Sequence, residues 1–91
     1  MPRSHRRIFS LNDRITAIDV EARQVAAELG YHRAINDDAQ RDAAVGNYID
    51  REEAGLTSGD VRRFERTLAR LAAKRRRLAA KRDHLLTRLP D

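Results

Sequence analysis

Apolar residues recur at alternating spacings of three and four in the last third of the chain, and this pattern constrains the fold more than any other feature. The positions are Val61, Phe64, Leu68, Leu71, Arg75, Leu78, Arg82, Leu85 and Leu89. Seven of these nine positions are apolar, which is typical of a helix that packs along another helix in a coiled-coil seam. Arg75 and Arg82 interrupt the seam. We expect their aliphatic stems to lie along it while their guanidinium groups reach water or a carboxylate.

The first half of the chain carries the same spacing. Its positions are Leu11, Ile15, Ile18, Ala22, Val25 and Leu29, continued by the smaller or more polar residues His32, Asn36, Ala39, Ala43, Gly46 and Asp50. The only prolines are Pro2 and Pro90, so no residue between them forbids a helix. We therefore predict an all-α fold, an antiparallel helical hairpin with a long basic C-terminal helix.

Two places along the chain are candidates for an interruption of the helices. The segment 55–59, Gly-Leu-Thr-Ser-Gly, offers a glycine for a helix C-terminus and two hydroxyl side chains that can cap the next helix. This predicts a helix over residues 11–54, a turn at 55–59 and a helix over residues 60–89, all in a single domain of residues 10–91. A break at 30–36, near Gly30, would instead give a three-helix bundle, and this alternative stays open.

A turn at 55–59 leaves part of the first helix without a partner. In that hairpin Leu89 lies opposite Val25, and residues 11–24 extend past the end of the chain. An unpaired apolar stripe then remains, consisting of Leu11, Ile15 and Ile18, and Val25 at its end completes the predicted oligomer contact. Because an exposed stripe of this size is unfavourable in water, we predict that it contacts a second copy or another protein. The protein is accordingly expected to be a homodimer or part of a heteromeric complex.

Charge is distributed unevenly along the chain, whose net charge is +5. Residues 1–9, predicted to form a flexible basic arm, carry +3, residues 10–59 carry −5, and residues 60–91 carry +7. The acidic half can pair with part of the basic half, and the surplus positive charge indicates an anionic partner. Edge positions of opposite sign support pairing within the chain: Glu21 and Glu28 on the first helix, and Lys74, Lys81 and Arg88 on the last.

One edge of the last helix carries a row of basic side chains at helical spacing. This basic edge consists of Arg63, Arg66, Arg70, Lys74, Arg77, Lys81 and Arg88, with His84 in the same row. Such a row can bind an acidic protein surface or follow a phosphate backbone, and it can also serve only as a solvated face. Few aromatic residues lie among the basic ones, which disfavours a platform for stacking single-stranded bases.

The segment 54–63 places Gly55 six positions before the branched apolar residue Val61. This arrangement resembles the turn and the start of the recognition helix in helix-turn-helix DNA-binding proteins, over about twenty residues of the chain. The sequence departs from that pattern at Arg51, where the motif has a small residue, and in the length of the second helix. A capped turn between two helices explains the same residues. The resemblance implies four residues that face DNA: Ser58, Arg62, Arg63 and Arg66.

We predict no catalytic, cofactor or metal site. The chain has no cysteine, and its three histidines, His5, His32 and His84, do not share a metal-binding spacing. We find no nucleophile–base pair, phosphate-binding loop or apolar run of about 20 residues, and we expect no signal sequence. We expect a cytoplasmic, non-enzymatic interaction module that self-associates and binds an anionic or acidic protein partner, without a membrane or a small-molecule substrate. Nucleic-acid binding, through the basic edge or the helix-turn-helix-like turn, is the alternative.

Overall fold

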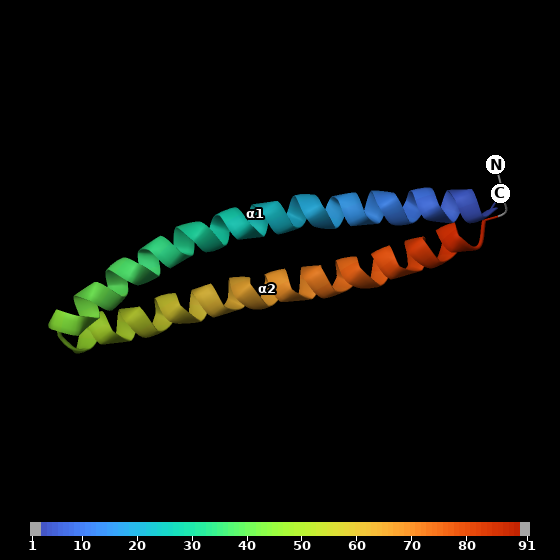
Figure 1. The fold of residues 1–91 in the computed structure, drawn as a ribbon. Helices are drawn as coiled ribbons and strands as arrows, with labels where there is room; N and C mark the ends of the chain where they lie inside the picture. The colour runs from blue at the N-terminus through green and yellow to red at the C-terminus, as the bar shows by residue number, and fades with distance from the viewer. Residues whose placement is uncertain (1–2, 90–91) are drawn as a thin grey trace. The chain divides into compact units, whose positions relative to one another are not determined.

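The computed structural model describes residues 3–89 and consists of two long helices that pack as an antiparallel hairpin (Figure 1). Helix α1 covers Arg3–Val45, and helix α2 covers Tyr48–Thr87. Residues 3–89 contain no strand. The predicted all-α hairpin is therefore confirmed. Gly30 lies inside α1, so the three-helix alternative is not needed.

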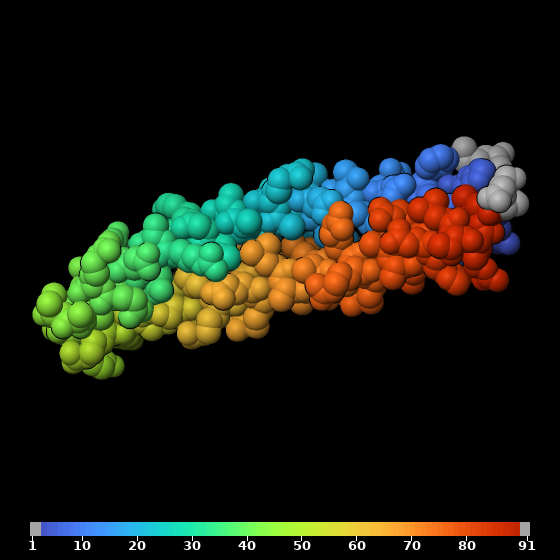
Figure 2. Space-filling view, in the orientation of Figure 1, coloured from blue at the N-terminus to red at the C-terminus, as the bar shows by residue number. Residues whose placement is uncertain are grey.

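The hairpin divides into two units, each made of antiparallel helical segments. Unit 1 comprises Met1–Arg23 and Arg70–Asp91, and unit 2 comprises Gln24–Ala69. In unit 1 the blue start of α1 lies beside the red end of α2, and in unit 2 the green turn joins the two helices (Figure 1). The side chains of the blue and red segments of unit 1 are in contact in the space-filling view (Figure 2).

The chain reverses at Gly46 and Asn47, not at the predicted residues 55–59. Asn47 caps α2, because its side-chain oxygen accepts the backbone N–H of Ile49 at 3.0 Å and that of Asp50 at 3.2 Å. Asp50 reciprocates, since its Oδ2 accepts the backbone N–H of Asn47 at 3.3 Å. This reciprocal arrangement is a capping box, which satisfies N–H groups that have no partner within the helix.

Glycine is required at position 46 but not at position 55. A Cβ added to Gly46 would lie 2.5 Å from the carbonyl oxygen of Asp42, closer than real Cβ atoms come to a neighbour. A Cβ added to Gly55 would meet nothing within 4 Å, and no glycine in residues 3–89 has a positive φ. Residues 55–59 are thus ordinary α-helix, and the predicted helix ends at residues 54 and 60 are wrong.

The reason for the reversal at 46–47 is the burial of the first apolar residues. Three of them, Leu11, Ile15 and Ile18, form the core of unit 1 with Leu78 of α2, and each is between 3% and 7% exposed. Three residues of α2 complete this core: Leu71, Ala79 and Leu85. A turn at 55–59 would have left the α1 residues in water, at a cost of about 25 cal/mol per Å² of apolar surface.

The predicted unpaired stripe is therefore wrong. Leu11, Ile15 and Ile18 are covered by the chain itself, so they are not available as the predicted oligomer contact. Val25, the fourth residue of that prediction, is half-buried in unit 2. If the protein self-associates, another surface must provide the contact.

The predicted flexible arm is also corrected over the described residues. Arg3 to Phe9 form the first turns of α1, while Met1 and Pro2 lie outside the described residues. Ile8 is 6% exposed. It lies three residues before Leu11 and so extends the seam toward the start of the helix.

The seam of unit 2 is smaller and more polar than that of unit 1. Its buried residues are Leu29, Ala39, Ala54 and Val61. The ring of His32 stacks on that of Phe64, with 4.7 Å between centroids. Asn36 Oδ1 accepts hydrogen bonds from Thr57 Oγ1 at 2.9 Å and from Ser58 Oγ at 3.1 Å. A polar group in a seam disfavours other alignments of the helices, so this layer helps to fix the register.

Candidate interaction surfaces

All seven residues of the basic edge are exposed, six of them on α2 and Arg88 directly after its last residue, Thr87. Those in unit 1 are Arg70, Lys74, Arg77, Lys81 and Arg88. Lys74, Arg77 and Lys81 make no hydrogen bond or ion pair within residues 3–89, whereas a guanidinium nitrogen of Arg88 lies 3.5 Å from the ring of His84. In unit 2, Arg63 forms an ion pair with Asp60 one turn earlier, and Arg66 is exposed.

The ion pairs predicted between the acids of α1 and the basic edge are not formed. Within residues 3–89 no ion pair joins Glu21 or Glu28 to Lys74, Lys81 or Arg88. The one acid of α1 that pairs with α2 in the described residues is Asp19, and its partner Arg75 belongs to the seam. The positive charge of the basic edge in unit 1 therefore faces solvent.

The guanidinium groups of the two arginines that interrupt the seam reach carboxylates, as predicted. Arg75 binds Asp19 at two points, with Nε 2.7 Å from Oδ1 and Nη2 3.3 Å from Oδ2. This hydrogen bonding lowers the pKa of the Asp19 carboxyl, against a smaller opposing effect of desolvation, and the charges of Arg75 and Arg23 lower it further. The same contact raises the pKa of Arg75.

Arg82, the second of these arginines, joins both helices of unit 1. Its Nη1 lies 3.2 Å from Asn12 Oδ1 on α1, and its Nε lies 3.1 Å from Asp83 Oδ1 on α2. Its side chain is 27% exposed. The stem therefore lies along the seam while the guanidinium group reaches polar partners.

Helix α1 adds two cations beside the basic edge. A groove of about 190 Å³ in unit 1, the basic groove, is lined by Arg7, Ser10, Leu11, Arg14 and Lys81. Arg7 and Arg14 are seven residues apart, which places them on one side of α1 two turns from each other. Neither they nor Lys81 make a hydrogen bond or ion pair within residues 3–89. Three cations from two helices thus surround one groove without a counter-ion from the described chain.

The α1 side of the basic groove was not predicted from the sequence. Which edge of α1 faces the basic edge depends on the register of the hairpin, and the predicted register was wrong. The only local signal was the spacing of Arg7 and Arg14 on either side of the seam residue Leu11.

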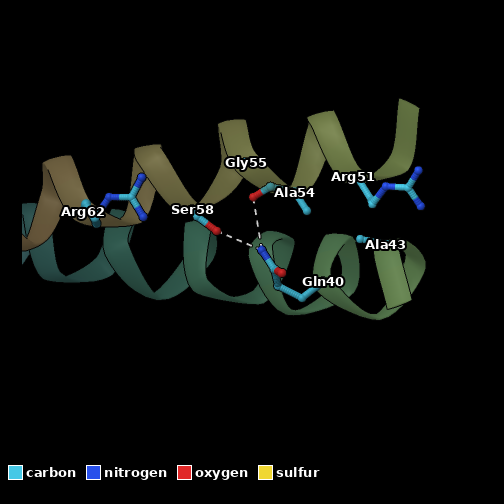
Figure 3. Close-up of a pocket in the computed structure, with 7 residues that line it drawn as sticks. All are labelled: Gln40, Ala43, Arg51, Ala54, Gly55, Ser58 and Arg62. Carbon is cyan, nitrogen blue, oxygen red and sulfur yellow. Dashed lines mark hydrogen bonds between the residues drawn. The ribbon is translucent and has the colours of Figure 1, made fainter. Parts of the chain in front are cut away.

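A second groove lies in unit 2 near the chain reversal (Figure 3). Its volume is about 370 Å³, and its lining consists of Gln40, Ala43, Arg51, Ala54, Gly55, Ser58 and Arg62. Gln40 reaches from α1 to α2 and donates to the carbonyl oxygen of Ala54 at 3.1 Å and to Ser58 Oγ at 2.8 Å. Arg51 and Arg62 lie at opposite ends of the groove (Figure 3). This groove was not predicted from the sequence.

The helix-turn-helix-like turn is absent from the fold. Residues 54–63 form uninterrupted α-helix within α2, so no separate recognition helix begins there. Ser58 is directed to Asn36 and Gln40 inside the hairpin, Arg62 lines the groove of unit 2, and Arg63 pairs with Asp60. The DNA-facing roles that the resemblance implied for Ser58, Arg62, Arg63 and Arg66 are therefore withdrawn.

Within residues 3–89, no three histidine, aspartate or glutamate side chains come together in an arrangement that could hold a metal ion. Neither helix, over the same residues, has an apolar stretch long enough to cross a membrane. Comparison of the chain with protein-family models, with curated proteins and with solved structures gives no match in any of the three. The class that the fold defines is the two-helix antiparallel hairpin.

Proposed function

We propose that this protein is a non-enzymatic, cytoplasmic interaction module that self-associates and binds an acidic protein partner at the basic groove of unit 1. The observation that carries the proposal is the convergence of Arg7, Arg14 and Lys81 on one groove without a partner in residues 3–89. Unit 1 has 13 Lys and Arg against five acids, a net charge of +8, whereas unit 2 has a net charge of −3. A strong positive field over unit 1 attracts an acidic partner and speeds the encounter.

The chemistry of the basic groove favours a protein over a nucleic acid. Guanidinium groups bind carboxylates through paired hydrogen bonds, which are stronger than neutral ones. The groove also contains the hydroxyl of Ser10 and the apolar side chain of Leu11. This mixture suits a partner segment in which acidic residues alternate with small or apolar ones.

Titration of the full chain with a fluorescent glutamate-rich peptide tests the proposal. We expect the double variant Arg14→Gln, Lys81→Gln to bind at least about tenfold more weakly, because a hydrogen bond to a charged group contributes about 1.5–3 kcal/mol. The control is the double variant Arg33→Gln, Arg41→Gln, which removes the same formal charge from exposed sites in unit 2. If the peptide binds equally weakly to both double variants, the loss reflects general charge attraction. That result would contradict a site at the basic groove.

Nucleic acid is tested in the same assay with duplex DNA and duplex RNA of generic sequence. A basic edge that follows a phosphate backbone loses orders of magnitude in affinity between about 50 and 200 mM salt. The proposal expects the peptide to bind more tightly than either duplex at the same salt concentration. Tighter binding of a duplex, with that steep salt dependence, would make nucleic acid the partner.

A further inference from the structure

Unit 1 has an apolar pocket formed by the first turns of α1 and the last turns of α2. Its volume is about 230 Å³, and its lining consists of His5, Ile8, Phe9, Leu86 and Leu89. Phe9 is 54% exposed and Leu86 is 48% exposed, which is high for large apolar side chains. Three exposed arginines lie close in sequence to the residues of this pocket, the end pocket, and give it a positively charged rim: Arg3 and Arg6 on α1, and Arg88 directly after α2.

Unit 2 has a surface of the complementary kind at the chain reversal. Val45, Tyr48 and Ile49 are 90%, 70% and 68% exposed, and they lie within five consecutive residues. Large apolar side chains grouped in water mark a contact surface. The exposed charged residues that flank this group in sequence are three acids, Asp42, Glu52 and Glu53, and two arginines, Arg41 and Arg51, of which Arg41 pairs with Asp38. The apolar group and the three acids form the surface that we name the tip.

We propose that the tip of one copy binds in the end pocket of a second copy. The two surfaces match twice, because an exposed apolar group meets an apolar pocket and a rim with an excess of carboxylates meets an arginine rim. A second copy is the occupant that this chemistry favours, since every chain carries both surfaces. The inference rests on the self-association in the proposed function, and it does not depend on an acidic partner at the basic groove.

Such an interface is heterologous, because two different surfaces of the chain meet. Each copy then engages two neighbours, so the average mass grows with protein concentration and does not stop at a dimer unless a ring closes. The side chains involved are few, which places the contact among small interfaces that bind weakly. The association should therefore appear between low and high micromolar concentration. The interface between tip and end pocket takes the place of the predicted oligomer contact at Leu11, Ile15 and Ile18, because these three residues are buried within the chain.

A mixing experiment tests this arrangement. The tip variant is Tyr48→Ala with Ile49→Ala, and the pocket variant is Phe9→Ala with Leu86→Ala. All four side chains are about half exposed or more, so their truncation should leave the hairpin folded, which circular dichroism verifies. The control truncates two exposed side chains outside both surfaces, Val20→Ala and Tyr31→Ala.

Sedimentation equilibrium of the wild type and the control is expected to show masses that rise above the 10.4 kDa of one chain with concentration. Each variant alone is expected to associate at least tenfold more weakly. An equimolar mixture of the two variants should form a dimer and nothing larger, because only one intact tip and one intact pocket meet. Charge reversal of the tip rim, Glu52→Arg with Glu53→Arg, should weaken wild-type association at low salt without altering an apolar residue.

The outcomes separate the inference from the proposed function. A wild type that stays at 10.4 kDa throughout would overturn both the self-association and the inference. Association that the tip and pocket variants leave unchanged would overturn the inference alone. Isolated variants that still dimerise, or a mixture that forms no dimer, would contradict the pairing of tip with pocket. The glutamate-rich peptide is titrated into the tip variant as well, so that binding at the basic groove is measured independently of self-association.

Discussion

Arg75 on α2 holds Asp19 on α1 at two points, with distances of 2.7 Å and 3.3 Å between the guanidinium nitrogens and the carboxylate oxygens. This ion pair reports the register of the hairpin in unit 1. The hydrogen bond from Arg82 to Asn12 requires the same register of α1 against α2. A reversal at 46–47 puts residue 19 opposite residue 75, whereas a reversal at 55–59 would have put residue 39 there.

The Asp19–Arg75 pair predicts how the stability of the protein depends on pH. The pKa of Asp19 is lowered from the usual 3.8 in the folded chain, so its contribution is present above pH 3.8 and is lost as pH falls through the lowered pKa. Urea unfolding should find Asp19→Asn less stable than the wild type near neutral pH, with a difference that shrinks at pH below 3.8. The effect is expected to be small, since the two side chains are 38% and 46% exposed. The control Asp13→Asn removes an exposed acid without an ion-pair partner in residues 3–89, and a pH-dependent loss of the same size there would refute the assignment.

Two glycine-to-alanine substitutions should change stability in opposite directions. Gly46→Ala places a Cβ 2.5 Å from the Asp42 carbonyl oxygen, and we expect it to lower the free energy of unfolding by about 1–3 kcal/mol. Gly55→Ala has open space and a helical backbone, so it should raise that free energy by about 0.5–1 kcal/mol. Chemical denaturation of both variants provides the measurement. Destabilisation by Gly55→Ala would contradict a helical backbone at this position and would support a turn at residues 55–59.

Leu78 is the most deeply buried large side chain of the core, at 3% exposed. Leu78→Ala removes contacts with Leu11, Ile15 and Ile18, and it should lower the free energy of unfolding by about 2–5 kcal/mol. For a two-helix chain of 91 residues this is a large part of the total stability. Val20→Ala, at a position 42% exposed, is the control, and thermal unfolding should place it close to the wild type.

We expect the hydrogen bonds of the polar layer in unit 2 to stabilise the folded hairpin. Asn36 Oδ1 accepts from Thr57, Ser58 and Gln40, so we expect Asn36→Ala to lower the free energy of unfolding by about 1–2 kcal/mol. Asn12→Ala removes a single contact with Arg82, which keeps Asp83 as a partner. The prediction is contradicted if urea unfolding finds Asn12→Ala as costly as Asn36→Ala.

The seam residues of both helices could be predicted from the sequence because their spacing follows directly from helix geometry. The positions from Leu11 to Gly46 and from Val61 to Leu89 are buried or half-buried in the structure, with Arg75 as the exception. The guanidinium groups of the two seam arginines also form hydrogen bonds with polar side chains of α1. Periodicity identifies the face that each helix buries, and this part of the fold needed no long-range information.

The position of the turn could not be predicted from local signals alone. Gly55, Thr57 and Ser58 offer a stronger apparent helix boundary than Gly46 and Asn47 do. The structure favours the weaker boundary because it buries Leu11, Ile15 and Ile18 of α1 against α2, a benefit that depends on the whole chain. The capping box of Asn47 and Asp50 was the local sign of the true turn. The basic groove and the tip were missed for the same reason, since both follow from where the chain reverses.

Cross-linking tests the register directly, since the chain has no native cysteine. Asp19→Cys with Arg75→Cys places thiols at the two ends of the observed ion pair, and Asp38→Cys with Arg75→Cys places them where a turn at 55–59 would bring residues together. A short bismaleimide is added to each dilute variant, and intramolecular linkage is read by mass spectrometry after proteolysis. The reversal at Gly46 and Asn47 predicts linkage in the first variant and none in the second. Linkage in the second variant and none in the first would contradict the hairpin on which every surface described above depends.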